Sequence, residues 1–200
     1  MIKKIESKAD KEKKEKRNQL VLAGILIVVM LFSIFGIVFQ YIGGAGGTTS
    51  SQNPTITYRG LTFQESNGYY VLQSGSSSFY FSINPQFAGN ATDNIFINKT
   101  LADYSGQVVY VSSPYDYNSY NEIYNDLSNY TLRVQGACAV NETCLDKTLP
   151  TKDCASNLIV IKNATMDQIY QKGNCVYIEG KTNDLLNLTD EFLLHILGIN

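Results

Sequence analysis

Four cysteines, the residues best suited to chemistry in this chain, lie between residues 138 and 175 with the spacing C-x5-C-x9-C-x20-C. Structural zinc sites favour cysteines two to four residues apart, and thioredoxin-like enzymes use C-x-x-C. Neither pattern occurs. Four cysteines allow three disulfide connectivities, and an even number outside the cytoplasm is most simply paired. We therefore predict disulfides Cys138–Cys144 and Cys154–Cys175, and no metal site.

No combination of nucleophile, base and acid stands out elsewhere. The only histidine, His195, lies between leucine and isoleucine near a predicted helix end, where a cation suits the helix dipole. Asp184, Asp190 and Glu191 share that helix, and we interpret them as solvated charges rather than a catalytic pair. The remaining loop acids lack the spacing of a calcium loop; they are Asp93, Asp103 and Asp116. The sequence predicts no catalytic residue and no cofactor.

Tyrosine and asparagine are concentrated in residues 115–130, YDYNSYNEIYNDLSNY. Tyrosine beside small polar residues is typical of surfaces that bind proteins or sugars. We assign Tyr115, Tyr117 and Tyr130 to a candidate surface for a protein or glycan partner. The alternative interpretation is that Tyr120 and Tyr124 are core contacts of an amphipathic helix. Residues 43–200 carry eight basic and fourteen acidic side chains, which disfavours nucleic acid as a partner.

N-linked glycosylation sequons are more frequent than the composition alone predicts. Six asparagines occur in N-x-S/T without an intervening proline. They are Asn90, Asn98, Asn129, Asn141, Asn163 and Asn187. Asn187 is expected on the polar side of its helix, within reach of a glycosylating enzyme. These sequons are consistent with an extracellular domain.

The uncharged run Leu20–Phe39 predicts the compartment, because twenty apolar residues form a helix long enough to cross a bilayer. Residues 1–17 carry eight basic and four acidic side chains, and positive flanks stay cytoplasmic. We predict a cytoplasmic tail over residues 1–19, a transmembrane helix over 20–42, a Gly/Ser/Thr linker over 43–54 and an extracytoplasmic domain over 55–200. The chain would lie in the cell membrane as a single-pass protein. A cleaved signal peptide is the open alternative.

The extracytoplasmic residues read as an α+β domain with a mostly antiparallel or mixed sheet and two packed helices. Alternating residues over 55–85 predict two hairpins. A strand at 107–113, a helix at about 119–129 and a strand after it predict a β-α-β unit. The last strands form a hairpin around Gly173-Asn174, with a short helix over 165–172 as the alternative.

Capping signals define the two helices. Ser119 and Glu122 match the capping-box pattern S-x-x-E. Thr182 or Asn183 is the expected cap of the last helix, and Gly198 is its expected C-terminal signal. Leucine, isoleucine and phenylalanine form one broad face of that helix, with Asn187 and Glu191 opposite.

The C-terminal 65 or so residues resemble an uncharacterised group of single-pass membrane-anchored proteins from archaeal genomes. The matching segments include ACAVNETC, LPTKDC, GNCVYIEG and the final LTDEFLLHILGI. The matching positions are Cys138, Cys144, Cys154, Cys175, Gly180, Asp190 and Gly198. The resemblance implies an anchored, cysteine-paired α+β ectodomain and supplies no catalytic residue.

These observations favour a membrane-anchored surface protein that acts as a binding module. The alternatives are an envelope enzyme that acts on glycans or peptides with acids assembled from distant positions, and a structural subunit of a membrane complex. The apolar run lacks a G-x-x-x-G pattern that would argue for self-association.

Overall fold

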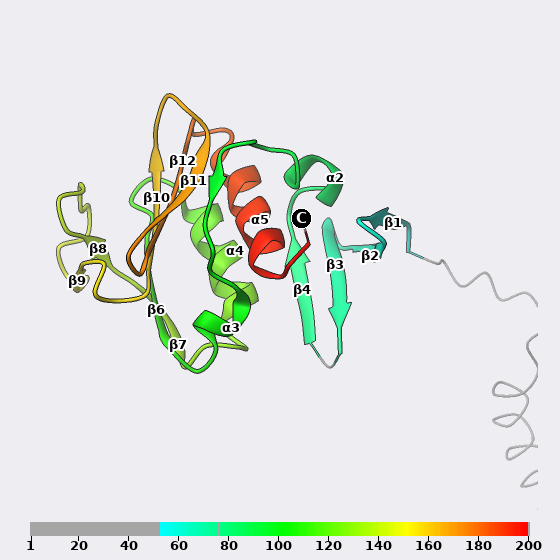
Figure 1. The fold of residues 1–200 in the computed structure, drawn as a ribbon, viewed down its shortest axis with the longest axis horizontal. Coiled ribbons are helices and arrows are strands. Elements are labelled where there is room, and N and C mark those ends of the chain that lie inside the picture. Colours follow the sequence, from blue (N-terminus) through cyan, green and yellow to red (C-terminus); the bar gives the residue numbers. More distant parts are fainter. Residues whose placement is uncertain (1–52, 76, 200) are drawn as a thin grey trace, which may run out of the picture. The chain divides into compact units, whose positions relative to one another are not determined.

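The computed structural model describes residues 53–75 and 77–199 (Figure 1). The predicted cytoplasmic tail, the predicted transmembrane helix and most of the predicted linker lie outside the described residues. No helix in the described part is long and apolar enough to span a membrane. The described residues belong to one compact unit that starts at Asn53. Its strands and four helices confirm the predicted α+β class.

Three consecutive hairpins build the smaller sheet, and the first two have tight two-residue turns. Its strands are β1 (Thr55–Tyr58), β2 (Leu61–Ser66), β3 (Tyr69–Ser74) and β4 (Ser77–Phe81), all antiparallel and in sequence order. Arg59 and Gly60 have φ values of 49° and 80°, and Asn67 and Gly68 have 52° and 82°. Positive φ at both central residues is the geometry of two-residue turns that match the strand twist. Both predicted hairpins, β1 with β2 and β3 with β4, are confirmed by their antiparallel pairing. The β2–β3 hairpin at Asn67-Gly68 joins them.

The larger sheet is mixed, with strand order β5-β11-β12-β10-β6-β7. Its strands are β5 (Ile95–Phe96), β6 (Val108–Ser112), β7 (Arg133–Gly136), β10 (Leu158–Asn163), β11 (Gln168–Lys172) and β12 (Cys175–Gly180). The neighbours β7, β6, β10 and β12 are parallel, and β11 returns antiparallel to β12. The predicted β-α-β unit and the hairpin at Gly173-Asn174 are both present. A short parallel pair, β8 (Cys138–Ala139) with β9 (Thr151–Lys152), follows β7.

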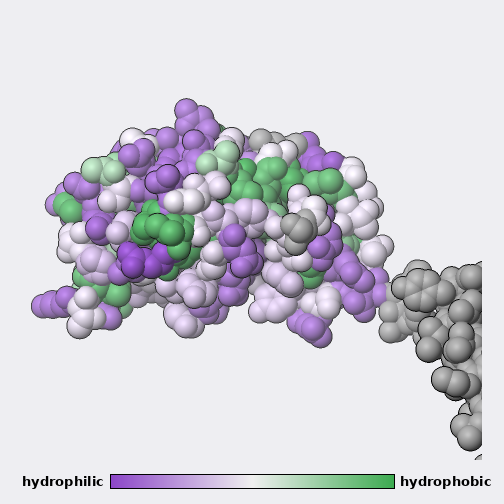
Figure 2. Space-filling model, turned by 90° about the horizontal axis from the view of Figure 1, so that it is seen from below, coloured by the Kyte–Doolittle hydropathy of each residue, from purple (hydrophilic) through white to green (hydrophobic). Residues whose placement is uncertain are grey.

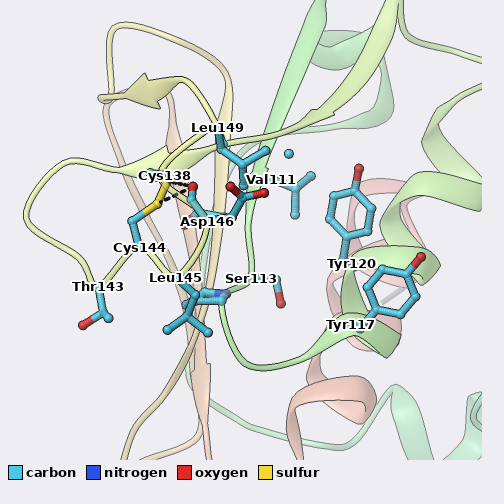
Figure 3. Close-up of a pocket in the computed structure, with 14 residues that line it drawn as sticks. Val111, Ser113, Tyr117, Tyr120, Cys138, Thr143, Cys144, Leu145, Asp146 and Leu149 are labelled. Carbon is cyan, nitrogen blue, oxygen red and sulfur yellow. Dashed lines mark hydrogen bonds between the residues drawn. A yellow bond between two sulfur atoms is a disulfide. The ribbon is translucent and has the colours of Figure 1, made fainter.

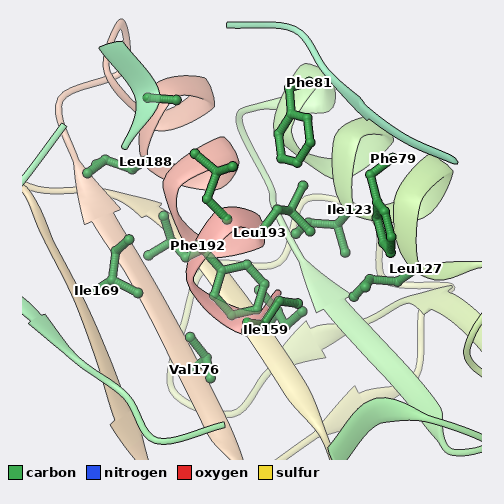
Figure 4. Close-up of a cluster of buried hydrophobic side chains, with 14 of the residues drawn as sticks. Phe79, Phe81, Ile123, Leu127, Ile159, Ile169, Val176, Leu188, Phe192 and Leu193 are labelled. Carbon is green, nitrogen blue, oxygen red and sulfur yellow. The ribbon is translucent and has the colours of Figure 1, made fainter. Parts of the chain in front are cut away.

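Helices α4 (Tyr117–Leu127) and α5 (Leu185–Ile196) fill the space between the sheets (Figure 1). The two other helices, α2 (Pro85–Ala88) and α3 (Leu101–Tyr104), are single turns. Phe79 and Phe81 from the small sheet meet Leu127 of α4 and Phe192 of α5 in one core (Figure 4). Each of these side chains is at most 1% exposed, and burying such a residue contributes roughly 1.5–3 kcal/mol. The core therefore joins both sheets through the helices.

The last helix is buried on nearly every side, which corrects two sequence predictions. Glu191, expected on a solvated face, is 4% exposed, and Asp190 is fully buried. The reason is that α5 packs against α4, α2 and β12, so its polar side also faces protein. The cap position is Asp184 rather than Thr182 or Asn183, without a side-chain capping hydrogen bond. Gly198, at φ 75°, ends the helix as predicted.

Buried carboxylates of α4 satisfy the outer edge of β4, where no further strand pairs. The amide nitrogen of Tyr80 donates to Asp126 Oδ1 at 2.8 Å. Ser82 donates to Glu122 twice, from its amide at 2.6 Å and from its hydroxyl at 2.7 Å. An unpaired buried N–H costs about 1–3 kcal/mol, so these carboxylates replace the missing strand.

Helix α5 continues the same arrangement along the chain that follows β4. The amide of Ile83 donates to Asp190 Oδ2 at 2.7 Å. The amide of Thr92 donates to Glu191 Oε2 at 2.9 Å. Four acids from two helices thus bind the small sheet and its following loop.

Burial changes the pKa of three of these acids, Asp126, Asp190 and Glu191. It raises the pKa of Asp126 to about 8 and that of Glu191 to about 7, although the hydrogen bonds from Tyr80 and Thr92 oppose the rise. Burial, together with the neighbouring Glu122, raises the pKa of Asp190 well above its ordinary value. Every ion pair among the described residues involves Lys162, so no cation neutralises this cluster there.

The predicted disulfides are confirmed. Cys138 pairs with Cys144, and Cys154 pairs with Cys175. The first ties the loop between β8 and β9 to β8, and the second joins the loop before β10 to the first residue of β12. No cysteine is free.

Replacing Cys154 and Cys175 by serine should destabilise the domain more than replacing Cys138 and Cys144. The Cys154–Cys175 bridge spans a sequence separation of 21, and the Cys138–Cys144 bridge spans a separation of 6. In the chain-entropy model this difference is worth about 1 kcal/mol in the free energy of unfolding. Urea unfolding of the two double variants measures it, and a larger loss from the Cys138 and Cys144 variant would contradict the expectation.

The domain should become less stable as the pH rises from about 5 to 8. A carboxyl whose folded pKa lies above its unfolded value stabilises the fold at low pH, and that stability is lost as the pH rises through the folded pKa. The stability that protonated Asp126 contributes is lost as the pH rises through its folded pKa of about 8. The stability that protonated Glu191 contributes is lost as the pH rises through about 7. Each contributes a slope of up to about 1.4 kcal/mol per pH unit.

The variant Asp126→Asn should flatten this pH profile, because asparagine keeps an acceptor for Tyr80 without a titrating group. Asp184→Asn is the matched control, since Asp184 makes no side-chain capping hydrogen bond and is only half-buried at the start of α5. Urea unfolding at a series of pH values distinguishes them. If the free energy of unfolding of Asp126→Asn falls with pH as steeply as that of the wild type, Asp126 does not contribute to the pH dependence.

Candidate functional site

A cavity of about 360 Å³ lies at the carboxyl ends of β6 and β7 (Figure 3). Ligands of open parallel sheets bind at this end of the strands, where connections diverge. Here the chain leaves β6 through α4 and enters β7 on one side of it. The neighbouring strand β10, on the other side of β6, is followed by strands that lie farther away in the opposite direction. The lining residues are Val111, Ser112, Ser113, Pro114, Tyr117, Tyr120, Gly136, Ala137, Cys138, Thr143, Cys144, Leu145, Asp146 and Leu149. Most of these side chains are apolar.

One wall of the cavity is a row of stacked tyrosines on α4. The ring centroids of Tyr117 and Tyr120 are 6.1 Å apart, and those of Tyr120 and Tyr124 are 6.2 Å apart. Spacings of three and four residues place them on one side of the helix. Partial burial raises the pKa of Tyr120, and its two neighbours add to the rise. Tyr117 is 73% exposed and Tyr124 is 45% exposed, so these two present their rings to solvent.

The opposite wall comes from the loop between β8 and β9, which the Cys138–Cys144 disulfide ties to β8. Leu145 and Leu149 contribute apolar surface, and both are exposed. Asp146 lies between them and is the single charged residue of the lining. Its Oδ1 accepts hydrogen bonds from the amide and the hydroxyl of Thr148 at 2.9 and 2.6 Å. These bonds lower the pKa of Asp146, which keeps the cavity negatively charged.

The N-terminus of α4, beside the cavity, is closed to anions by its own cap. Asp116 Oδ1 accepts from the amides of Asn118 and Ser119 at 3.0 and 3.3 Å. The predicted cap Ser119 is therefore wrong, and the helix begins at Tyr117. The cause is that Asp116 binds the amides of the first turn, whereas Ser119 is buried within it and donates its hydroxyl to Asp116.

The three tyrosines of the predicted binding surface are not together. Tyr117 lines the cavity, and Tyr115, 60% exposed, precedes α4. Tyr130 instead stacks on Phe79 with a centroid distance of 4.9 Å and packs against the core. Ile123 and Leu127 are the fully buried core contacts of α4. Tyr120 is half-buried and packs against the same core, as its alternative predicted, whereas Tyr124 is exposed.

The residues that sequence reasoning missed are two leucines in the loop between β8 and β9. Leu145 and Leu149 lie in a polar stretch without periodicity, so no strand or helix pattern marked them. Both leucines follow Cys144 within five residues, outside the ring that the Cys138–Cys144 disulfide closes. Only the fold shows that this loop faces α4.

The acids considered for catalysis have structural partners. Asp190 and Glu191 accept backbone amides, and Asp184 lies at the start of α5. A smaller cavity of about 180 Å³ is lined by Glu191 and His195 together with Arg59 and Asp93. No group of three or more potential metal-ligating side chains occurs in the described part of the chain.

The sequons differ in accessibility. Five asparagines are exposed: Asn90, Asn98, Asn129, Asn141 and Asn163. Asn187 is half-buried and its amide oxygen is enclosed without a hydrogen-bond partner, so the expectation that it is accessible is corrected. The cause is again that α5 is covered on both sides.

No family model, no curated protein and no solved structure matches this chain.

Proposed function

We propose that this chain is a membrane-anchored surface protein whose α+β domain binds a polypeptide partner. The cavity at the ends of β6 and β7 receives an apolar or aromatic side chain of the partner, next to a basic residue. Support for the outer location comes from the apolar run Leu20–Phe39, from the charge difference across it and from the two disulfides.

The shape and lining of the cavity carry this proposal. A volume of about 360 Å³ lies at the lower end of the range for ligand sites, and it suits one large side chain rather than an extended molecule. Val111, Leu145 and Leu149 offer apolar contact, and Tyr117 and Tyr120 offer aromatic faces. A sugar needs several hydrogen-bonding groups in its site, and this lining has few. A peptide side chain is the better fit.

The charge of the cavity indicates which residue of the partner lies next to the inserted side chain. Asp146 is the only charged lining residue, and its hydrogen bonds keep it ionised. Residues 43–200 carry fourteen acidic and eight basic side chains, which adds a wider negative field. Electrostatic complementarity therefore favours lysine or arginine beside the inserted side chain and disfavours aspartate or glutamate.

The domain should bind the dipeptide acetyl-Trp-Arg-amide more tightly than acetyl-Trp-Glu-amide, by about tenfold or more in Kd. The chain contains no tryptophan, so tryptophan fluorescence reports the ligand alone. The full-length chain in lipid nanodiscs is titrated with each peptide, and anisotropy gives the two Kd values. Equal affinity for the two peptides would contradict the charge assignment, and no binding of either would contradict the proposed site.

Two variants should separate the parts of the cavity. Tyr120→Ala removes a lining ring and should weaken both peptides by about tenfold, since aromatic contacts contribute ~0.5–1.5 kcal/mol beyond their buried area. Tyr124→Ala is the matched control, because it belongs to the same stacked row but does not line the cavity. Asp146→Asn should abolish the preference for arginine and retain binding. Equal losses in the two tyrosine variants would place the ligand elsewhere.

A further inference from the structure

Exposed phenylalanines are restricted to two positions in the described part of the chain. Four phenylalanines there are at most 1% exposed, whereas Phe87 is 69% and Phe96 is 68% exposed. On the face drawn in Figure 2 the surface is mainly hydrophilic, and hydrophobic side chains gather in a few separate groups. Single exposed apolar residues are common. The unusual observation is that each of these two rings lies just before a sequon, Phe87 three residues before Asn90 and Phe96 two residues before Asn98.

The backbone places Phe96 and Asn98 on the same side. Exposure alternates along this extended segment, so Phe96, Asn98 and Thr100 are exposed while Ile97 and Lys99 face inward. The whole pattern Phe-x-Asn-x-Thr is therefore presented to solvent. The amide nitrogen of Asn98 donates to the side-chain oxygen of Gln171 at 3.2 Å, which ties the asparagine to β11.

An open depression of about 460 Å³ lies directly beside Asn98. Its walls are Phe96, Ile97, Asn98, Gln171 and Gly173. A sugar attached to the Asn98 side chain would start in this depression with the Phe96 ring beside it.

At Asn90, a turn of the backbone brings the asparagine near the preceding Phe87. Its amide nitrogen donates to the carbonyl oxygen of Phe87 at 3.2 Å, which closes the turn after α2 and brings residues three apart together. The side-chain nitrogen of Asn90 donates one hydrogen to the carbonyl oxygen of Gln86 at 2.8 Å. The amide has two hydrogens, so this bond can persist after the other is replaced by a sugar.

We infer that Asn98 and Asn90 carry N-linked glycans and that the first sugar of each lies on the preceding phenylalanine ring, Phe96 or Phe87. In the transfer, the asparagine Nδ2 attacks C1 of a sugar held on a lipid phosphate or pyrophosphate. The Nδ2–C1 bond forms, the C1–O bond to phosphate breaks, the lipid phosphate leaves and the amide loses one proton. The inference rests on the outer location included in the proposed function.

The physical basis is burial of apolar surface on both partners. One face of a pyranose ring presents C–H groups, and an aromatic face carries the negative part of the ring quadrupole. Stacking removes both from water and leaves the sugar hydroxyls solvated. The glycan at Asn98 would also cover β5, an outer strand whose free edge is open to unwanted pairing. The cavity by β7 is at the opposite end of the sheet and stays accessible.

Site occupancy is tested by peptide mass spectrometry of the full-length chain isolated from its native membranes. We expect Asn98 and Asn90 to be modified in a larger fraction of molecules than Asn129 and Asn163, which are exposed sequons without an exposed phenylalanine before them. Unmodified Asn98 and Asn90 would overturn the inference. If the disulfides are formed in that sample, the outer location stands; if the cysteines are reduced, the outer location fails as well.

Stacking is tested by a double-mutant cycle in a host that glycosylates Asn98, with Phe96→Ala, Asn98→Gln and the combined variant. Asn98→Gln should lower Tm by roughly 2–4 °C in the wild-type background. It should have little effect in the Phe96→Ala background, where the sugar has no ring to cover. Asn129→Gln is the matched control and should behave alike in both backgrounds. Equal effects of Asn98→Gln in the two backgrounds would show that the sugar does not lie on Phe96.

Discussion

The outer edge of β4 has no strand to pair with, and the way its amides are satisfied determines how the domain is assembled. Asp126 and Glu122 on α4, then Asp190 and Glu191 on α5, accept the amides of β4 and its following loop. An edge strand normally needs protection or pairing. Here acids of two helices pair with the backbone amides instead of a strand. The cost is the burial of these acids, which raises the pKa of Asp126, Asp190 and Glu191.

This interaction also explains the orientation of the candidate site. The acids and the apolar residues Ile123 and Leu127 hold one side of α4 against the core. The tyrosine row is therefore directed outward, beside the loop that the Cys138–Cys144 disulfide ties to β8. A rigid helix on one side and a disulfide-tied loop on the other form a cavity that needs little ordering when a ligand binds, and preorganisation of this kind favours affinity.

Local patterns in the sequence were sufficient for the hairpins of residues 55–85 and for the β-α-β unit, because alternation and helical periodicity are set by neighbouring residues. The disulfides followed from the even number of cysteines and the absence of metal or redox spacing. Long-range packing was not visible. Glu191 and Asp190 have the spacing of solvated helix charges, and only the covering sheet and loop make them buried acceptors. The position of Tyr130 on Phe79, and of Leu149 opposite α4, likewise depends on segments distant in sequence. The cap Asp116 was overlooked because Ser119 fitted a familiar pattern.

Amide hydrogen exchange at the four docked positions tests this account most directly. If the carboxylates hold the edge of β4, the amides of Tyr80, Ser82, Ile83 and Thr92 should exchange nearly as slowly as those of the central strand β10. The outward amides of β1, at the other edge of the same sheet, serve as the internal comparison and should exchange quickly. Equally fast exchange at both edges would contradict the proposal that helix carboxylates replace a pairing strand.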